Sequence, residues 1–314
     1  LTAWVAGGTK IFALGAALHR HGLALPNQGD IDQQSISGAT ATGTHGTGTS
    51  LQNLSSRVIG ARIALASGEI VECSPSHNSE LWQASRLHLG AFGLVVALQL
   101  QCVASYRLQE QIQKLPLNAA LDDLDDLVTN NRHCEFFWYP QSDIANLKTI
   151  NPTDAAAQYP LAGEGERCGW NFEVLPNHRP HLHTEMEYSV RASQGPECMR
   201  AIQSLLNDTF TDVRWPVEYR TLAADDVWLS TAYQRDTVTI SVHQDVNLPD
   251  GDYYRACEEI FLDFDGRPHW GKANYLTGEQ LAKQHARWDD WWRVRDGVDP
   301  KGTFLNPYMR SIRP

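Results

Sequence analysis

The sequence of 314 residues predicts an α+β fold, and two patterns support this prediction. Apolar residues recur at helical spacing in residues 9–22, whereas they alternate in residues 94–103, which is the spacing of a strand. After about residue 108, glycine-punctuated segments give way to a series of expected strands. We therefore expect two lobes: a glycine-rich lobe that binds a ligand, followed by a strand-rich lobe.

The first lobe is expected to contain short helices and antiparallel strands. In the helix at 9–22, Thr9 can cap the start and Gly22 suits the end. Three further elements are predicted after it: a hairpin at 57–73 that turns at Ser67-Gly68, a short helix at 80–88 and the strand at 94–103.

The second lobe is expected to consist mainly of strands. These are predicted at residues 134–140, 184–190, 214–222 and 235–245. Met186, Tyr188 and Val190 fall on one side of their strand, because alternate side chains point to opposite faces.

Helices are expected in the second lobe at two places. Residues 121–128 predict a helix with an acidic outer face, and residues 277–300 predict one long helix, whereas residues 141–182 show little regular pattern. The long helix has a capping-box start at Thr277 and Gln280. Its expected packing residues are Trp288, Trp291 and Trp292.

The composition excludes several classes of function. With 26 Lys and Arg against 37 Asp and Glu, the net charge of −11 disfavours a nucleic-acid partner. The sequence contains no run of about eighteen apolar residues, so it does not predict a membrane span. Six scattered cysteines without a CxxC pair favour a reducing compartment, and we expect a cytoplasmic location. Neither a serine nucleophile elbow nor an HExxH helix is present, which disfavours hydrolases and metalloproteases.

The segment SGATATGTHGTG, residues 37–48, combines glycine, threonine and one histidine without a charged side chain. Its backbone N–H groups and hydroxyls can surround a phosphate or the carbonyl oxygens of a ring. The same composition is typical of an ordinary loop, and composition alone does not decide between the two. A second glycine turn, HLGAFGLV at 88–95, is explained by an ordinary helix-to-strand connection.

Two charged motifs are candidates for chemistry. Glu218 and Arg220 share one face of an expected strand, where a carboxylate and a guanidinium can position hydroxyls, although a surface ion pair is the commoner arrangement. His269 and Lys272 lie in a turn that faces either a pocket or solvent. The histidines of NHRPHLH, residues 177–183, match no zinc spacing, so we expect a solvated loop and no metal site.

Taken together, these stretches resemble the aldonolactone oxidases (L-gulono- and D-arabinono-1,4-lactone oxidases), which are related to alditol oxidase, in the vanillyl-alcohol-oxidase superfamily of FAD flavoproteins. The resemblance covers essentially the whole chain. It is carried by HGLALPNQGDIDQQSISGATATGTHGTG (21–48), RLHLGAFGLVVALQL (86–100), VEYRTLAADDVWLS (217–230), RPHWGKAN (267–274) and FLNPYMRSI (304–312).

The resemblance implies FAD as cofactor and a sugar lactone or polyol as substrate. It also implies that the Gly/Thr segment runs along the flavin and pyrophosphate, while the glycine turn before residue 94 helps hold the adenosine end. The implied FAD contacts are Gly38, Thr42, Gly43, His45, Gly46, Gly48, Gly93 and Val95. The implied catalytic residues are Glu218, Arg220, His269 and Lys272, with Ser241 and His243 as further substrate contacts.

The implied chemistry is oxidation of a carbinol carbon by hydride transfer to flavin N5, with oxygen reduced to hydrogen peroxide. In that scheme Lys272 or Arg220 stabilises negative charge near flavin N1, Glu218 orients a substrate hydroxyl, and His269 accepts a proton. The alternatives are an alditol oxidase, an aldonolactone dehydrogenase with another electron acceptor, and a flavin-free, non-catalytic sugar-binding remnant.

The resemblance also implies a domain plan. Residues 1–108 correspond to the second half of an FAD-binding domain with a partial vanillyl-alcohol-oxidase-type lobe. Residues 109–285 form a substrate domain with an antiparallel sheet flanked by helices, and residues 286–314 return to the FAD domain. Family members carry a further FAD subdomain before the position of Leu1. We expect that part to have been removed, to come from another chain, or to be missing from a form that binds FAD poorly.

Overall fold

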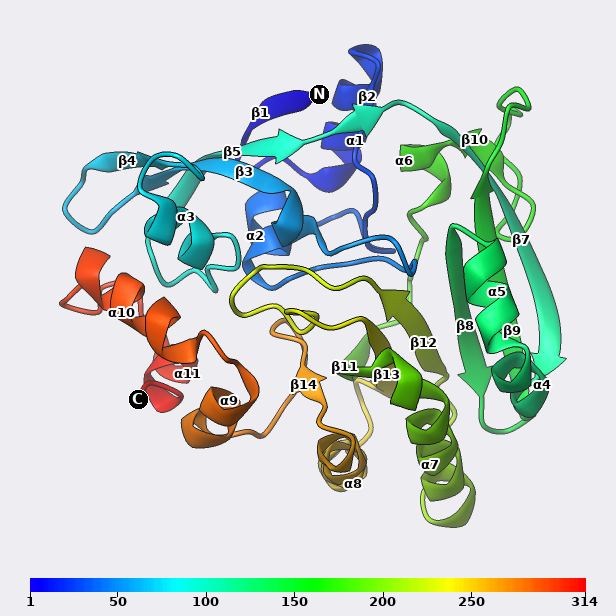
Figure 1. Cartoon of the computed structure of the whole chain (residues 1–314). Coiled ribbons are helices and arrows are strands. Elements are labelled where there is room, and N and C mark those ends of the chain that lie inside the picture. Colours follow the sequence, from blue (N-terminus) through cyan, green and yellow to red (C-terminus); the bar gives the residue numbers. More distant parts are fainter.

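The computed structural model describes residues 1–314, and its first lobe is a four-stranded antiparallel sheet with helices beside it (Figure 1). The strand order is β1 (Thr2–Ala6), β5 (Leu94–Gln101), β3 (Val58–Ala64) and β4 (Ile70–Cys73). The helices are α1 (Ile11–Arg20), α2 (Ile36–Ala41), the 3-10 turn η1 (Leu54–Arg57) and α3 (Ser79–Ser85). A small two-stranded sheet joins β2 (Leu23–Ala24) to β6 (Val103–Ala104).

The second lobe is built on an eight-stranded sheet in which every neighbouring pair is antiparallel. Its order is β10 (Cys168–Trp170), β7 (Arg107–Pro116), β9 (Ile144–Pro152), β8 (His133–Tyr139), β12 (Val217–Leu222), β13 (Thr237–Asp245), β11 (His183–Arg191) and β14 (Arg267–Pro268). The helices of this lobe are α4 (Leu117–Asp122), α5 (Leu124–Asn130), α6 (Asn171–Val174), the 3-10 turn η2 (Ala192–Gln194), α7 (Gly195–Asp208) and α8 (Gly251–Asp263).

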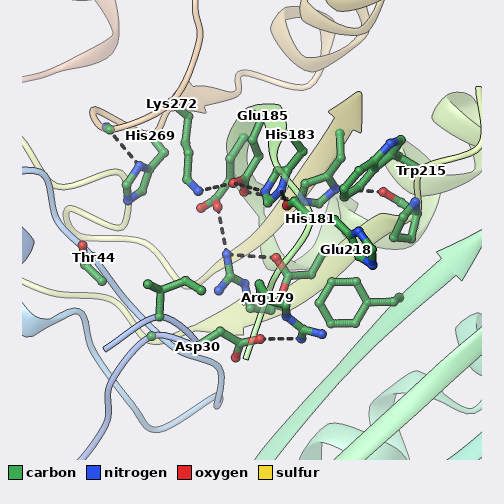
Figure 2. A pocket seen from close by; sticks show the side chains of 18 of the residues that line it. Asp30, Thr44, Arg179, His181, His183, Glu185, Trp215, Glu218, His269 and Lys272 are labelled. Atoms are coloured by element: carbon green, nitrogen blue, oxygen red, sulfur yellow. Dashed lines mark hydrogen bonds and ion pairs between the residues drawn. The ribbon is translucent and has the colours of Figure 1, made fainter. Parts of the chain in front are cut away.

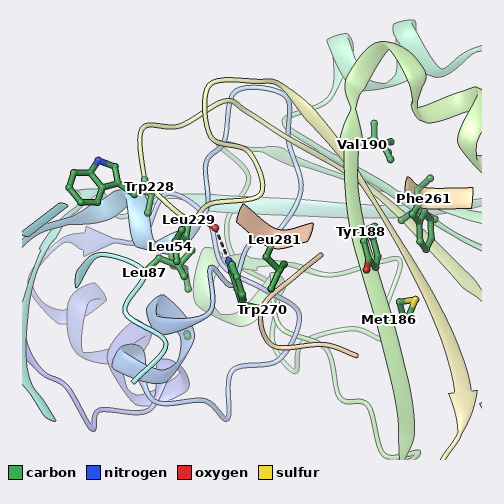
Figure 3. Packing of buried hydrophobic residues seen from close by; sticks show 14 of the residues in the cluster. Leu54, Leu87, Met186, Tyr188, Val190, Trp228, Leu229, Phe261, Trp270 and Leu281 are labelled. Atoms are coloured by element: carbon green, nitrogen blue, oxygen red, sulfur yellow. Dashed lines mark hydrogen bonds between the residues drawn. The ribbon is translucent and has the colours of Figure 1, made fainter. Parts of the chain in front are cut away.

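One face of the eight-stranded sheet carries the apolar core. Met186, Tyr188 and Val190 of β11 are fully buried there, as the alternation predicts. Tyr188 stacks on Phe261 of α8 with ring centroids 5.0 Å apart (Figure 3). Helices α7 and α8 cover this face, so the opposite face of β11, β12 and β13 is left to polar residues.

The chain ends in three helices, α9 (Gly278–Gln284), α10 (Trp288–Val298) and α11 (Pro307–Ser311), of which α10 packs against α3 of the first lobe (Figure 1). Trp291 donates its indole N–H to the carbonyl of Leu87 at 3.0 Å. The three tryptophans predicted to pack, Trp288, Trp291 and Trp292, are all buried. The domain boundaries at 108 and 285 stay predictions.

Several element predictions are confirmed. They are the hairpin turning at Ser67-Gly68, the helix near residue 80, the strand from residue 94, the strand pair β12–β13, and the capping box at Thr277 and Gln280. The prediction of a single helix over residues 277–300 is wrong, because the chain becomes extended at His285. The ring of His285 stacks on Trp270 with ring centroids 5.2 Å apart. That break separates α9 from α10.

Three other expectations differ from the structure. Thr9 does not cap α1, since the residue before the helix is Lys10 and the Thr9 carbonyl accepts a hydrogen bond from Ile36 N–H at 2.8 Å. The acidic segment 121–128 belongs to two helices, α4 and α5, which meet at Asp123. The segment 141–182 contains the nine-residue strand β9, whose buried Lys148 obscured its apolar alternation.

No helix in this structure has both the length and the apolar character needed to cross a membrane.

Candidate active site

The polar face of the eight-stranded sheet assembles a site from strands that are far apart in sequence. In the register of β11 with β13, Glu185 lies opposite His243 and Glu187 lies opposite Ser241. In the register of β12 with β13, Glu218 also lies opposite Ser241. Because side chains alternate between faces, all five of these residues point to the same side of the sheet, away from α7 and α8.

A cavity of about 510 Å³ lies over this face, between the sheet and the Gly/Thr segment of the first lobe (Figure 2). Its size falls in the range of small-molecule sites, which is about 300–1,000 Å³. The structure brings seven of the predicted site residues to its wall: Thr42, His45, Glu218, Arg220, His243, His269 and Lys272. The predicted residues that do not line it are Gly38, Gly43, Gly46, Gly48, Gly93, Val95 and Ser241.

Glu187 connects the two lobes across this cavity. One of its oxygens lies 2.6 Å from His45 Nε2, and the other accepts hydrogen bonds from Arg220 and from the Ser241 hydroxyl, both at 2.8 Å. Burial acts to raise the pKa of the Glu187 carboxyl, but His45 and Arg220 outweigh it and hold this pKa well below its usual range. Ser241 therefore acts as a support for Glu187 rather than as part of the cavity wall.

Arg220 places a buried positive charge at the wall of the site. Its guanidinium lies 2.8 Å from Glu187 and 3.2 Å from Glu218, and all three side chains are at most 8% exposed. The Glu218–Arg220 contact is thus buried and faces a cavity, unlike a solvated surface pair, and Glu187 is the charged partner of Arg220. Removing one partner of such a pair leaves an uncompensated charge in a medium of low dielectric constant.

Burial dominates the titration of Glu218. It raises the pKa of this carboxyl to about 8, against the favourable charge of Arg220 and together with the nearby carboxylates of Glu135 and Asp30. At neutral pH Glu218 therefore holds its proton. A carboxyl that titrates close to neutrality is suited to proton transfer.

Lys272 points into the cavity and forms an ion pair with Glu185 (Figure 2). Glu185 was not predicted from the sequence; its pKa is held well below its usual range because Lys272 and His243 offset the cost of burial. Lys272 in turn has a raised pKa, since the charge of Glu185 outweighs its own burial. The lysine therefore stays charged at the wall of the cavity.

His269 is a neutral imidazole in this site, because burial lowers its pKa to about 4. Gly271 N–H donates a hydrogen bond to His269 Nδ1 at 3.1 Å, so Nδ1 acts as the acceptor of the ring. The neutral ring must then carry its proton on Nε2. This geometry makes His269 a hydrogen-bond donor at Nε2, and its role as a proton acceptor stays a prediction.

The site also contains residues that sequence reasoning missed. Asp30, from the turn-rich stretch before the Gly/Thr segment, lies 2.7 Å from Arg179, and both line the cavity. Glu185 and Glu187 could have been found from TEMEYSV, because two carboxylates alternate there with the predicted apolar face. No local signal pointed to Arg179, which lies in the segment expected to be a solvated loop.

The Gly/Thr segment is part helix and part extended chain. Residues 36–41 form α2, which corrects the expectation of a loop throughout. Beyond it, Thr47 donates its hydroxyl to the carbonyl of Cys134 at 2.6 Å, and Gly48 N–H donates to the carbonyl of Thr221 at 2.9 Å. These bonds fix the segment against the ends of β8 and β12, so His45 reaches the cavity.

The residues of this segment fit an FAD-type ligand. The backbone N–H group of buried His45, which lines the cavity, forms no hydrogen bond within the protein, and a buried donor without an acceptor is costly. Thr42 and Thr44 also line the cavity and offer hydroxyls. These three residues would hold the carbonyl or phosphate oxygens of such a ligand.

The other predicted FAD contacts lie away from the cavity. Gly93 immediately precedes β5 and Val95 lies within it, and an ideal Cβ on Gly93 would lie 2.4 Å from the carbonyl oxygen of Ala64. Val95 packs beside Gly7 and near Ser37 at the start of α2, which also carries Gly38. The predicted contacts of these residues, and of Gly43 and Gly48, with FAD stay predictions.

Gly46 offers a test of how closely the segment is packed. An ideal Cβ on Gly46 would lie 2.3 Å from the carbonyl oxygen of Gln28 and 2.5 Å from Asn27 Oδ1. We expect Gly46→Ala to destabilise the fold by about 1–3 kcal/mol, measured by urea unfolding, and to lower FAD retention after desalting. Gly8→Ala is the matched control, since no atom lies within 4 Å of its ideal Cβ. Equal stability of the two variants would contradict the prediction.

The raised pKa of Glu218 predicts how stability changes with pH. The folded protein keeps this proton up to about pH 8, whereas the unfolded carboxyl releases it near its ordinary value of 4.5. The stability linked to this proton is therefore fully present below about pH 4.5 and is lost as the pH rises through about 8. The side chain of Glu218→Gln cannot ionise, so we expect this variant to gain stability relative to the wild type as the pH rises from about 4.5 to about 8. The urea midpoints of both proteins at these two pH values measure the gain. A difference between the two proteins that does not change with pH would refute the raised pKa of Glu218.

Comparisons with known proteins agree with this geometry. The profile of the D-arabinono-1,4-lactone oxidase family matches residues 98–166 and 156–312, and that of an FAD-binding domain matches residues 1–74. The chain is 37% identical to L-gulono-1,4-lactone dehydrogenase of Mycobacterium tuberculosis, over 98% of this chain and 80% of the relative. It is 27% identical to L-gulonolactone oxidase of Bos taurus, with the same coverage of both chains.

Among solved structures, the fold is similar to that of a solvent-stable cholesterol oxidase, with a TM-score of 0.86. That match covers 99% of this chain and 81% of the other at 17% identity, so it supports the fold alone. The two profile matches and the 37% identical relative define the family. The chain therefore belongs to the D-arabinono-1,4-lactone oxidase family of FAD-dependent oxidoreductases.

Proposed function

We propose that this protein oxidises a sugar-derived 1,4-lactone at a carbinol carbon, with hydride transfer to N5 of FAD. One observation supports the proposal above the others: a charged Lys272, a charged Arg220, a neutral His269 and a protonated Glu218 converge on one cavity beside His45. This set offers fixed positive charge, a neutral hydrogen-bond donor and a group that titrates near neutrality, which are the groups that dehydrogenation of an alcohol requires.

The cations are the groups that stabilise charge. When bound, FAD supplies N5 as the hydride acceptor and gains negative charge near N1. Lys272 and Arg220 both line the cavity, and water screens the charge of Arg220 little because its side chain is only 8% exposed. Their carboxylate partners, Glu185 and Glu187, hold them in place.

Glu218 and His269 handle the substrate hydroxyl in this proposal. Glu218 has a pKa of about 8, so its ionised form can take the hydroxyl proton at mildly basic pH. His269 presents Nε2–H, which can donate to a ring or carbonyl oxygen of the lactone. His243 also lines the cavity and can hydrogen-bond a further hydroxyl. Compared with the sequence-based expectation, the proton acceptor moves from His269 to Glu218.

The electron acceptor has two candidates. Oxygen, reduced to hydrogen peroxide, is the acceptor that the sequence resemblance implies. A dehydrogenase that passes its electrons to another acceptor is favoured by one observation, since the 37% identical relative carries that name while the oxidase of Bos taurus is 27% identical. An alditol oxidase acting on a linear polyol and a flavin-free sugar-binding remnant are further outcomes of the test below.

The test begins with the visible absorption spectrum of the purified chain after incubation with FAD and desalting. Retained flavin bands that bleach under anaerobic addition of an aldonolactone support the proposal. Bleaching only by a polyol supports an alditol oxidase, whereas sugar binding without retained flavin supports the remnant. Admitting oxygen then separates the acceptors: stoichiometric hydrogen peroxide indicates an oxidase, and reoxidation only by an added artificial acceptor indicates a dehydrogenase. The cytoplasmic location and the absence of a nucleic-acid partner stay predictions.

A further inference from the structure

We infer that His183, Glu185 and His243 form a binding site for a divalent transition metal at one side of the cavity, of the kind that takes Zn²⁺. Glu185 Oε1 lies 3.6 Å from His243 Nε2, and Glu185 Oε2 lies 3.9 Å from His183 Nε2. One ligand atom from each of the three residues lies within 4.8 Å of the others. Figure 2 shows Glu185 between Lys272 and His183.

The two imidazole rings are held as metal ligands usually are. His243 Nδ1 donates to the carbonyl of Pro216 at 2.8 Å, and His183 Nδ1 donates to the carbonyl of His181 at 3.1 Å. A neutral ring whose Nδ1 carries the proton presents the lone pair of Nε2. Both Nε2 atoms face the Glu185 carboxylate, and each presents its lone pair to a metal when its ring is neutral. Backbone acceptors behind both rings are typical of histidines that bind zinc.

The spacing requires side-chain rotation of about an ångström to bind a metal. Zinc–nitrogen bonds of about 2.0–2.1 Å in a tetrahedral site place ligand atoms about 3.4 Å apart. The 3.6 Å separation is to Oε1 and the 3.9 Å separation is to Oε2, and one ligand atom of each residue lies within 4.8 Å of the others, so a movement of at most about 1.4 Å brings three ligand atoms to this spacing. All three residues line the cavity, so the fourth position faces its interior. Two histidines, one carboxylate and an open position are a ligand set that zinc accepts.

Two other groups of titratable residues in the cavity do not meet these conditions. In the group of His45, Glu187 and His269, the Glu187 carboxylate is already taken by Arg220 and Ser241, and His269 Nδ1 accepts from a backbone N–H. The group of Asp30, Glu135 and Glu218 contains only carboxyls and is neutralised by neighbouring cations. The group around Glu185 alone has unused nitrogen lone pairs.

The positive charge of Lys272 disfavours metal binding, and this effect distinguishes a metal site from a purely structural cluster. Its ammonium pairs with Glu185 Oε2, so a metal bound at the Oε1 side would share the carboxylate with a positive charge. Removing that charge should tighten metal binding, whereas removing a ligand should weaken it. A variant that merely damaged the fold would weaken binding in both cases.

The experiment is calorimetric titration of Zn²⁺ into the purified protein and its variants at neutral pH. We expect one equivalent bound by the wild type, binding at least about 10-fold weaker in His183→Gln, and tighter binding in Lys272→Met. His181→Gln is the matched control, because it removes a histidine of the same segment while the backbone carbonyl that supports His183 remains. It should bind as the wild type does.

Three outcomes would overturn the inference: no stoichiometric binding by the wild type, unchanged affinity in His183→Gln, or weaker binding in Lys272→Met. Co²⁺ supplies a second readout on the unaltered protein, since its visible d–d bands report a four-coordinate site with nitrogen ligands. A metal bound here would share the cavity with the lactone, so added lactone should weaken metal binding. This competition rests on the proposed function, whereas the metal titration does not. The metal site and the proposed function can therefore fail separately.

Discussion

Replacing Lys272 with methionine is expected to slow reduction of the bound flavin by lactone at least about 100-fold, the usual cost of removing one preorganised group that stabilises charge in the transition state. Methionine keeps the length of the side chain and removes the ammonium that pairs with Glu185 at the wall of the cavity. Retention of FAD should change far less, because the N–H groups and hydroxyls of the Gly/Thr segment remain. Anaerobic stopped-flow absorbance measures the reduction, and desalting measures the retention.

Lys283→Met is the matched control for this experiment. Lys283 also pairs with a carboxylate, Glu279, but its side chain is 73% exposed on α9 and does not line the cavity. It should leave flavin reduction unchanged. If Lys272→Met lowered FAD retention as much as it slowed reduction, Lys272 would be a cofactor-binding residue and its catalytic role would be refuted.

Replacing Arg220 with methionine is expected to destabilise the folded protein by about 3–5 kcal/mol, because it leaves buried charge without a partner. Arg220 is the cation shared by Glu187 and Glu218, and each of these carboxyls is at most 6% exposed. The charge of Glu187 remains in the variant, since its pKa is also lowered by His45. Urea unfolding at neutral pH gives the free energy directly.

Arg62→Met supplies the comparison for Arg220. Arg62 pairs with Glu72 across β3 and β4, where both side chains are about half exposed, and such surface pairs contribute roughly 0–1 kcal/mol. The difference between the two variants isolates the effect of burial on an ion pair. If Arg220→Met cost no more than Arg62→Met, the cluster around Glu187 would not be energetically coupled in the folded protein.

The sequence was most informative where one strand carries its own pattern. The alternation in TEMEYSV predicted that Met186, Tyr188 and Val190 share one face of the strand, and in the structure all three are buried together. The Glu218–Arg220 pair was placed on one face for the same reason, and both residues line the cavity. Local periodicity is sufficient in these cases because the spacing of side chains along a strand is fixed by the backbone.

The sequence was least informative where the site depends on pairing between distant strands. Glu185 lies opposite His243, 58 positions further along the chain, and nothing local to either residue reveals this register. Arg179 reaches Asp30 from a segment that was expected to be solvated. The protonation of His269 likewise depends on burial and on one backbone N–H, neither of which a sequence pattern contains.

The charged groups around Glu187 and Glu218 are buried on the polar face of the eight-stranded sheet. Helices α7 and α8 cover the other face of this sheet. Dissolved ions screen charges only where the solvent reaches them, over about 8 Å at physiological ionic strength. The pairs around Glu187 and Glu218 are at most 8% exposed, so dissolved salt has little access to them. The contribution of these buried groups to the electric field of the cavity is therefore set by the protein, and it changes little with the ionic strength of the surrounding medium.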